Sequence, residues 1–221
     1  MHSRDKWGWL YVPWIICLSS FLINLIVGFA VPGQEAFYTG GISSIFVYLF
    51  VMGIVAPNQT FPFALGMSAS RKDYFLGTTA AAVLFSAGNA VLLLLLSLIE
   101  QGTNQWGEGL HFFSLPFVNE GSLLMQWLTY TMVFLYLFFS GFLIASVYRK
   151  FGKYGMFIFF GIILLVLLVA PLLITYFEGW VDIGRWIVSS FHSLNDLAPW
   201  LLLKGAIMAL VSYLLLLRST V

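Results

Sequence analysis

The chain has 221 residues, of which 61% are hydrophobic and only 9% are charged, and its formal net charge is +1. A soluble domain carries about 25% charged residues, so this composition cannot build a water-exposed surface, and lipid must be the main solvent. The near-zero net charge excludes a field that would attract nucleic acid or an acidic partner. We therefore predict an all-α membrane protein forming a single transmembrane domain over residues 1–221.

Six apolar stretches approach the roughly 20 residues that a helix needs to cross the hydrocarbon core. In chain order they are 14–31, 41–56, 74–99, 123–148, 154–177 and 198–217. Pro57 and Pro62 are predicted to end the second stretch, which is the shortest. Between the fifth and sixth spans, residues 178–197 carry Trp180 and Ile183 at helical spacing, which predicts an interfacial or re-entrant helix.

The distribution of Lys and Arg predicts the orientation of these spans, because cytoplasmic loops carry an excess of basic residues. With the N-terminus inside, the cytoplasmic segments hold Arg4, Lys6, Arg71, Lys72, Arg149, Lys150, Lys153 and Arg218. The acids agree, since most of them fall on the other side of the membrane. We expect a multi-pass protein with both termini in the cytoplasm.

Sequence motifs for catalysis are missing. The single Gly-Lys pair, Gly152–Lys153, has Val147 where the first glycine of a phosphate-binding loop is required. Three histidines, His2, His111 and His192, lie in separate segments on both predicted sides, so they cannot form one metal site. We expect no enzyme activity, no metal and no cofactor in this chain itself.

Small residues spaced four apart predict where helices pack closely, because apolar side chains gain little by leaving lipid for one another. Gly141 and Ala145 form such a pair in the fourth span, and Gly205 and Ala209 form one in the sixth. Internal packing is the favoured interpretation, and a dimer interface is the alternative.

Polar residues within the spans are candidates for a substrate path. Lys204 is the clearest ionisable one, and Asn24 and Asn89 are the main neutral ones. The alternative for Lys204 is a side chain that reaches the headgroups or pairs with Asp182 or Asp196. The alternative for both asparagines is a hydrogen bond that links helices.

The predicted cytoplasmic segment Pro57–Tyr74 mixes apolar and basic residues. Ser70 followed by Asp73 matches the start of a helix, so Ser70 is expected to cap the third span. Before it, the run from Phe61 to Met67 is long enough for about two turns of helix lying along the membrane surface. It forms either an interfacial anchor or a docking element for a cytoplasmic partner, and both interpretations stay open.

The run F-P-F-A-L-G-M-S-A-S-R-K-D-Y-F-L-G-T, Phe61 to Thr78, resembles a segment of the small six-span permease subunits of bacterial ABC transporters of the exporter type (type 2). The run L-H-F-F-S-L-P-F, Leu110 to Phe117, resembles their connection between the third and fourth spans. One departure is the N-terminus, where only Trp7 to Pro13 is available for the longer amphipathic helix that many relatives carry.

The resemblance implies a permease that pairs with a second copy or a paralogue and recruits a separate cytoplasmic ABC ATPase subunit, which holds ATP and Mg. The first cytoplasmic loop would be the coupling element, with Phe61, Phe63, Leu65, Arg71 and Lys72 facing the ATPase. Movement of this loop on ATP binding would pass to the spans and give alternating access at the permease dimer. The location would be the bacterial cytoplasmic membrane.

The predicted cargo is hydrophobic or amphipathic, such as a lipid, a peptide or a drug-like molecule, because the spans carry almost no charge. Aromatic residues of the fourth span, among them Phe134, Tyr136, Phe138 and Phe139, are expected to line the path. The alternative function is a non-transporting membrane scaffold, sensor or immunity protein. It predicts that the loop from Phe61 to Arg71 can be scrambled without harm.

Overall fold

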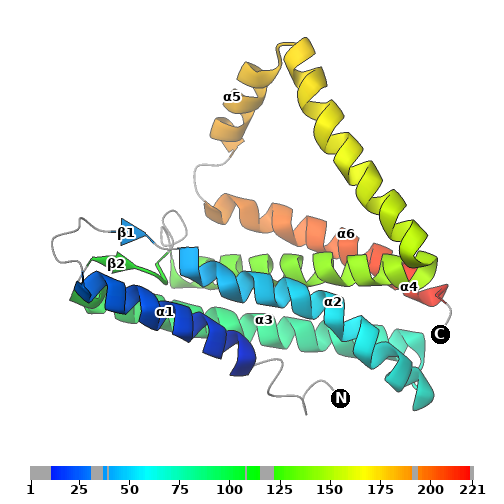
Figure 1. The fold of residues 1–221 in the computed structure, drawn as a ribbon, viewed down its shortest axis with the longest axis horizontal. Helices are drawn as coiled ribbons and strands as arrows, with labels where there is room; N and C mark the ends of the chain where they lie inside the picture. The colour runs from blue at the N-terminus through cyan, green and yellow to red at the C-terminus, as the bar shows by residue number, and fades with distance from the viewer. Residues whose placement is uncertain are drawn as a thin grey trace.

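A computed structural model of the protein describes residues 11–30, 37–38, 40–107, 109–114, 122–190 and 194–219. This part of the chain is all-α (Figure 1). Its helices are α1 (Val12–Ala30), α2 (Ser43–Gly66), α3 (Arg71–Gly102), α4 (Leu123–Tyr176), α5 (Trp180–Ser190) and α6 (Ala198–Leu217). Short 3-10 turns are η3 (Gly40–Ile42), η4 (Gln105–Gly107) and η5 (Leu194–Leu197), and two-residue strands β1 (Phe37–Tyr38) and β2 (Leu110–His111) pair in parallel.

Five of the described helices, all except α5, are long and apolar enough to cross a membrane, which is compatible with a multi-pass membrane protein. The sequence predicts six spans, and the difference lies in α4. This helix has 54 residues. At a rise of about 1.5 Å per residue it measures roughly 80 Å, far more than the roughly 30 Å of a hydrocarbon core.

A break at Gly152 divides α4 into a first arm, residues 123–151, and a second arm, residues 153–176. The backbone there has φ 66° and ψ −160°, which is not helical. A positive φ of this kind is readily adopted only by glycine. The fourth and fifth predicted spans coincide with the two arms. Figure 1 shows the second arm leaving the bundle and α5 leading the chain back toward α6.

The prolines of α2 do not end the helix, which corrects the sequence prediction. Pro57 and Pro62 both lie inside α2, and the helix continues to Gly66. The two turns of surface helix expected after Phe61 are therefore the last turns of α2 itself. Proline is tolerated in membrane helices where polar side chains compensate backbone groups. Pro57 and Pro62 remove the amides that would bond the carbonyls of Gly53 and Asn58, and Asn58 Nδ2 donates at 3.0 Å to the neighbouring Ile54 carbonyl.

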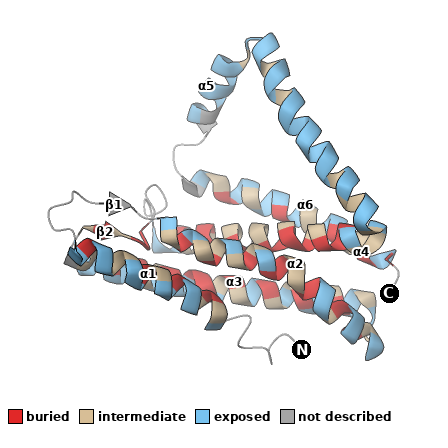
Figure 2. Ribbon diagram, in the orientation of Figure 1, coloured by how far each residue is buried: buried red, intermediate tan, exposed pale blue. Residues whose placement is uncertain are grey.

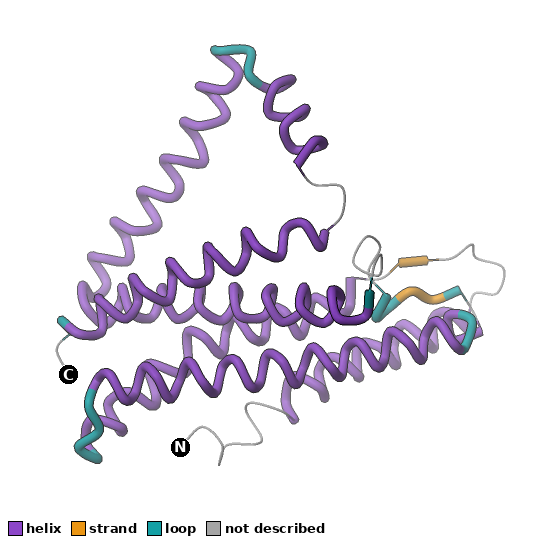
Figure 3. The backbone as a smooth tube through the Cα atoms, turned by 180° about the vertical axis from the view of Figure 1, so that it is seen from behind, coloured by secondary structure: helices purple, strands orange, loops and turns teal. Residues whose placement is uncertain are grey.

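The first arm of α4 is the centre of the bundle and packs against α2, α3 and α6. Figure 2 shows that the buried residues lie on the faces that these helices turn toward one another. In contrast, no residue of the second arm is buried, and the described side chains of α5 are exposed as well. The view from behind in Figure 3 shows the same separation of the second arm and α5 from the bundle.

Two glycines set the approach of α2 to the first arm of α4. A Cβ added at Gly53 would overlap the Phe138 carbonyl oxygen, and one added at Gly141 would overlap the Phe50 carbonyl oxygen. The two backbones are therefore in direct contact, as is common for small residues in membrane helices. Gly141 was predicted as a packing position, and its internal role is confirmed. Its counterpart Gly53 was not predicted.

Candidate functional site

One end of the bundle gathers basic residues from three helices, and we call it the basic end. Arg71 begins α3, Arg149 and Lys150 lie at the end of the first arm of α4, and Arg218 follows α6. Contacts between these helices, described below, bring the four residues to the same end. The turn between α2 and α3, residues 67–70, projects from this end (Figure 1), and we count the flanking residues 61–66 and 71–72 as part of it. The predicted ATPase-coupling residues all lie in or beside this turn.

The turn is shaped by local backbone chemistry. Ser70 is the N-cap of α3, as predicted, and its Oγ accepts a hydrogen bond from the Asp73 amide at 3.1 Å. The Ser70 hydroxyl also donates to Asp73 Oδ2 at 2.6 Å. A carboxylate in the first turn is favourable because of the positive end of the helix dipole. Ser68 has a φ of 62°, which lets the chain reverse between the two helices.

The outer face of the turn is apolar and exposed. Phe63 is 55% exposed and Met67 is 67% exposed, and Lys72 in the first turn of α3 is exposed as well. Leu65 is only partly buried, because one side of it packs against the core. Aromatic and methionine side chains are enriched on surfaces that contact another protein.

Phe61 lies on the inner face of the turn, not on its surface. It is 0% exposed, and its ring meets that of Tyr74 edge to face with centroids 5.1 Å apart. The Tyr74 hydroxyl forms a 2.8 Å hydrogen bond with Thr60 Oγ1. Of the residues predicted to face a partner, Phe61 is therefore an anchor that joins the end of α2 to the start of α3.

Arg149 connects this anchor to α4. Its guanidinium lies over the Phe61 ring, 4.7 Å from the centroid, and donates to the Pro57 carbonyl at 3.4 Å. A cation over an aromatic face is worth about 0.5–2 kcal/mol, more where it is desolvated. Arg149 was expected only as a basic residue of a cytoplasmic turn, and its contact with Phe61 was not predicted.

Arg71 connects the turn to α6 in the same way. Its guanidinium donates to the carbonyls of Leu216 and Leu217 at 3.2 and 2.5 Å. The last carbonyls of a helix have no partner within the helix, so a cation that binds them satisfies them and matches the helix dipole. The predicted coupling residue Arg71 thus acts as a second anchor, and Phe63 and Lys72 remain as the exposed ones.

The three candidates for a substrate path do not come together. Asn89 is 1% exposed, accepts from Trp14 Nε1 at 2.8 Å and donates to the Phe85 carbonyl at 2.7 Å, so it links α3 to α1. Asn24 Nδ2 donates within α1 to the Ser20 carbonyl at 2.8 Å. Lys204 is exposed on α6, which lies on the far side of α2 and α4 from α1 in Figures 1 and 3.

The aromatic residues predicted to line the path are part of the core. Phe134, Phe138 and Phe139 are all buried, with Phe134 in one core cluster and the other two in the next. Tyr136 is partly buried, and its backbone lies next to Gly205 of α6. In this structure the aromatic residues of the fourth predicted span pack between helices. This corrects the prediction that they line a substrate path.

The opposite end of the bundle contains a buried carboxylate that sequence reasoning missed. Glu100, near the end of α3, is 0% exposed and accepts hydrogen bonds from five donors. Oε2 accepts from Trp106 Nε1 and from the amides of Phe112 and Phe113 at 3.1, 3.1 and 2.8 Å. Oε1 accepts from the Ser114 amide at 3.0 Å and the Ser114 hydroxyl at 2.8 Å. We call these donors the Glu100 cradle.

The Glu100 cradle fixes the irregular segment between α3 and α4 onto the bundle. Three successive amides that converge on one anion form a concave nest. Around it, the rings of Phe21, Trp106, Phe112 and Phe113 pack with centroids 4.8–6.4 Å apart. His111 Nδ1 lies 3.9 Å from Glu100 Oε1. The sequence signal that could have identified Glu100 was an acidic residue directly after an apolar run, followed by aromatic residues.

The fold and the polar contacts define a class: an all-α protein with five described helices able to span a membrane, a basic, anchored turn at one end and a buried carboxylate at the other. No protein-family model matches the chain, and no curated protein and no solved structure is detectably similar to it. Its function is therefore argued from these residues.

Proposed function

We propose that this chain is the transmembrane permease subunit of an ATP-driven ABC transporter of the exporter type in the bacterial cytoplasmic membrane. ATP and Mg would be held by a separate cytoplasmic ATPase subunit. The observation that carries the proposal is the turn between α2 and α3. Its outer face exposes Phe63 and Met67, while its inner face is anchored to the bundle.

The anchors support a mechanical role for the turn. Phe61 meets Arg149 of α4, and Arg71 bonds the end of α6. A force applied to Phe63 would therefore reach α2, α3, α4 and α6 together. A turn held only by its own backbone would bend instead. This is what coupling of ATP binding to alternating access requires, because a packed contact transmits displacement.

The proposed topology has six spans, with the two arms of α4 as the fourth and fifth. The break at Gly152 falls among Arg149, Lys150 and Lys153, and basic turns stay on the cytoplasmic side. Both termini then lie in the cytoplasm. The α5 helix has 11 residues, too few to cross, and would lie in the opposite interface.

A second permease copy or a paralogue is part of the proposal. Within the described chain, the second arm has no buried residue although 24 residues of regular helix are available for contact. The cargo would be hydrophobic or amphipathic, a lipid, a peptide or a drug-like molecule, and its path would lie between two permeases. ATPase activity of the purified complex that responds only to hydrophilic solutes would contradict this cargo class.

Affinity purification of the tagged protein from its native membranes tests the proposal. Copurification of a P-loop ATPase, measured as ATP hydrolysis and by mass spectrometry, is the expected result. Phe63→Glu should remove that activity from the purified sample, because it places a charge in an apolar contact. Phe29→Glu is the matched control: it puts the same charge on a phenylalanine of similar exposure, 59%, at the end of α1 away from the turn.

Two results would refute the coupling role. One is a protein that purifies intact with no ATPase partner, and the other is ATPase recovery that Phe63→Glu leaves unchanged. A scrambled turn that leaves the cell phenotype of the protein intact would favour the scaffold, sensor or immunity function.

A further inference from the structure

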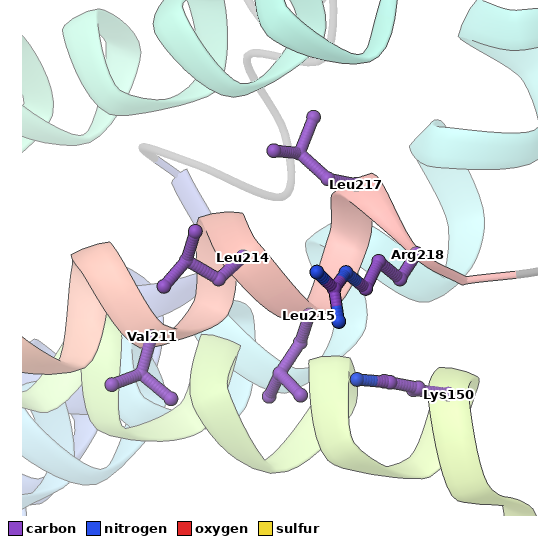
Figure 4. Close-up of a pocket in the computed structure, with 6 residues that line it drawn as sticks. All are labelled: Lys150, Val211, Leu214, Leu215, Leu217 and Arg218. Carbon is purple, nitrogen blue, oxygen red and sulfur yellow. The ribbon is translucent and has the colours of Figure 1, made fainter.

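The basic end contains a pocket between α4 and α6 that combines two cations with an apolar groove. Its cavity volume is about 330 Å³. It is lined by Lys150, Val211, Leu214, Leu215, Leu217 and Arg218. Figure 4 shows the side chains of Lys150 and Arg218 extending toward the same opening from the two helices, with Leu215 close to both.

The two cations have no acidic partner in the described part of the chain. The one acid described at this end is Asp73, and its Oδ2 is held by Ser70. The last carbonyls of α6 are already bound by Arg71, so Arg218 is not needed to satisfy them. Lys150 Nζ lies over the Phe151 ring at 4.9 Å, and a neutral ring brings no negative charge to balance that of the lysine. The pocket is therefore suited to an anion.

The depth of the pocket indicates what kind of anion fits. The α6 helix has 20 residues and is about 30 Å long, the thickness of the hydrocarbon core. Arg218 directly follows its last residue, so its charge lies at headgroup level. Val211 lies seven residues earlier, about 10 Å deeper along the helix at 1.5 Å per residue. The cavity thus leads from a charged mouth into an apolar wall.

We propose that this pocket binds an anionic phospholipid, with its phosphate between Lys150 and Arg218 and the start of an acyl chain along Val211, Leu214 and Leu215. Basic pockets between membrane helices bind such headgroups. A free phosphate would use the cations and leave the groove empty. The inference rests on the membrane-spanning character of α6 and does not depend on the transporter proposal.

Native mass spectrometry of the delipidated protein in detergent tests the site by titration with phosphatidylglycerol and with phosphatidylcholine. We expect phosphatidylglycerol to bind more tightly. Lys150→Gln/Arg218→Gln should weaken its binding roughly 30-fold, because each cation near a headgroup contributes about fivefold. Lys150→Arg/Arg218→Lys should retain binding, which separates loss of charge from loss of folding.

The matched control is Lys72→Gln/Lys153→Gln, which removes the same charge from exposed positions at the same end. It should leave phosphatidylglycerol binding within about twofold of wild type. An equal loss in this control, or equal binding of the two lipids, would overturn the proposal. Competition by millimolar glycerol phosphate as effective as that by the whole lipid would also overturn it, because the groove would then contribute nothing.

Discussion

Replacing Glu100 by glutamine tests how much the buried carboxylate contributes to stability. The best orientation of the new amide keeps its oxygen toward Trp106, Phe112 and Phe113, where three donors converge. Its NH₂ group then faces the amide and the hydroxyl of Ser114. The hydroxyl can rotate to accept a hydrogen bond, and the Ser114 amide is left as a buried donor with no acceptor.

The cost of Glu100→Gln follows from these contacts. A buried donor without a partner costs about 1–3 kcal/mol. Each of the three remaining bonds changes from charge-assisted to neutral, which loses roughly a further 0.5–1 kcal/mol per bond. The sum is about 2.5–6 kcal/mol. For a chain of this size the expected fall in Tm is roughly 10 °C, at about 2–4 °C per kcal/mol.

Thermal unfolding of the purified protein in detergent measures this shift, and limited proteolysis between α3 and α4 should become faster. Glu178→Gln is the matched control, because Glu178 is exposed and its loss should change Tm by less than about 2 °C. If Glu100→Gln melted as close to wild type as this control, the Glu100 cradle would not hold the segment in place.

Three further substitutions have expected outcomes in the same unfolding assay. Gly141→Ala should destabilise the protein by about 2 kcal/mol or more, because the new Cβ has no space beside α2. Its control is Gly161→Ala, which should be neutral or slightly stabilising because the space around Gly161 is open. Asn89→Leu should lower the free energy of unfolding by about 1–2 kcal/mol, because it removes the acceptor of Trp14 Nε1. In a protein that already carries Trp14→Phe, the donor is absent and much of that loss should disappear. Ser70→Ala should cost about 1 kcal/mol, and an unchanged Tm would contradict the cap.

Features that depend on local composition could be predicted from the sequence. The apolar runs gave the helices α1, α3 and α6 nearly to their ends, because a span is defined by its own hydropathy. The Ser70 cap was predicted correctly, since both its donor and its acceptor lie within four residues. The short helix after the fifth predicted span was also predicted, and it is α5.

Features that depend on neighbouring helices could not be predicted in this way. Phe61 and Phe63 are two residues apart and equally apolar, yet one is buried under Arg149 and the other is exposed. Pro57 signals the end of an isolated helix, yet α2 continues through it while packed against the first arm of α4. Glu100 finds its donors 6–14 residues away in an irregular segment, which no periodicity indicates.

The contact between Gly53 and Gly141 limits how the bundle can change shape. Each glycine sits against the other helix's backbone at a place where any side chain would collide. Sliding α2 along the first arm of α4 by one turn would move bulky neighbours of Gly53, such as Leu49 or Phe50, into a gap that admits only hydrogen. Shear between these two helices is therefore blocked. Any change in the shape of the bundle must therefore move α2 and the first arm of α4 as a pair.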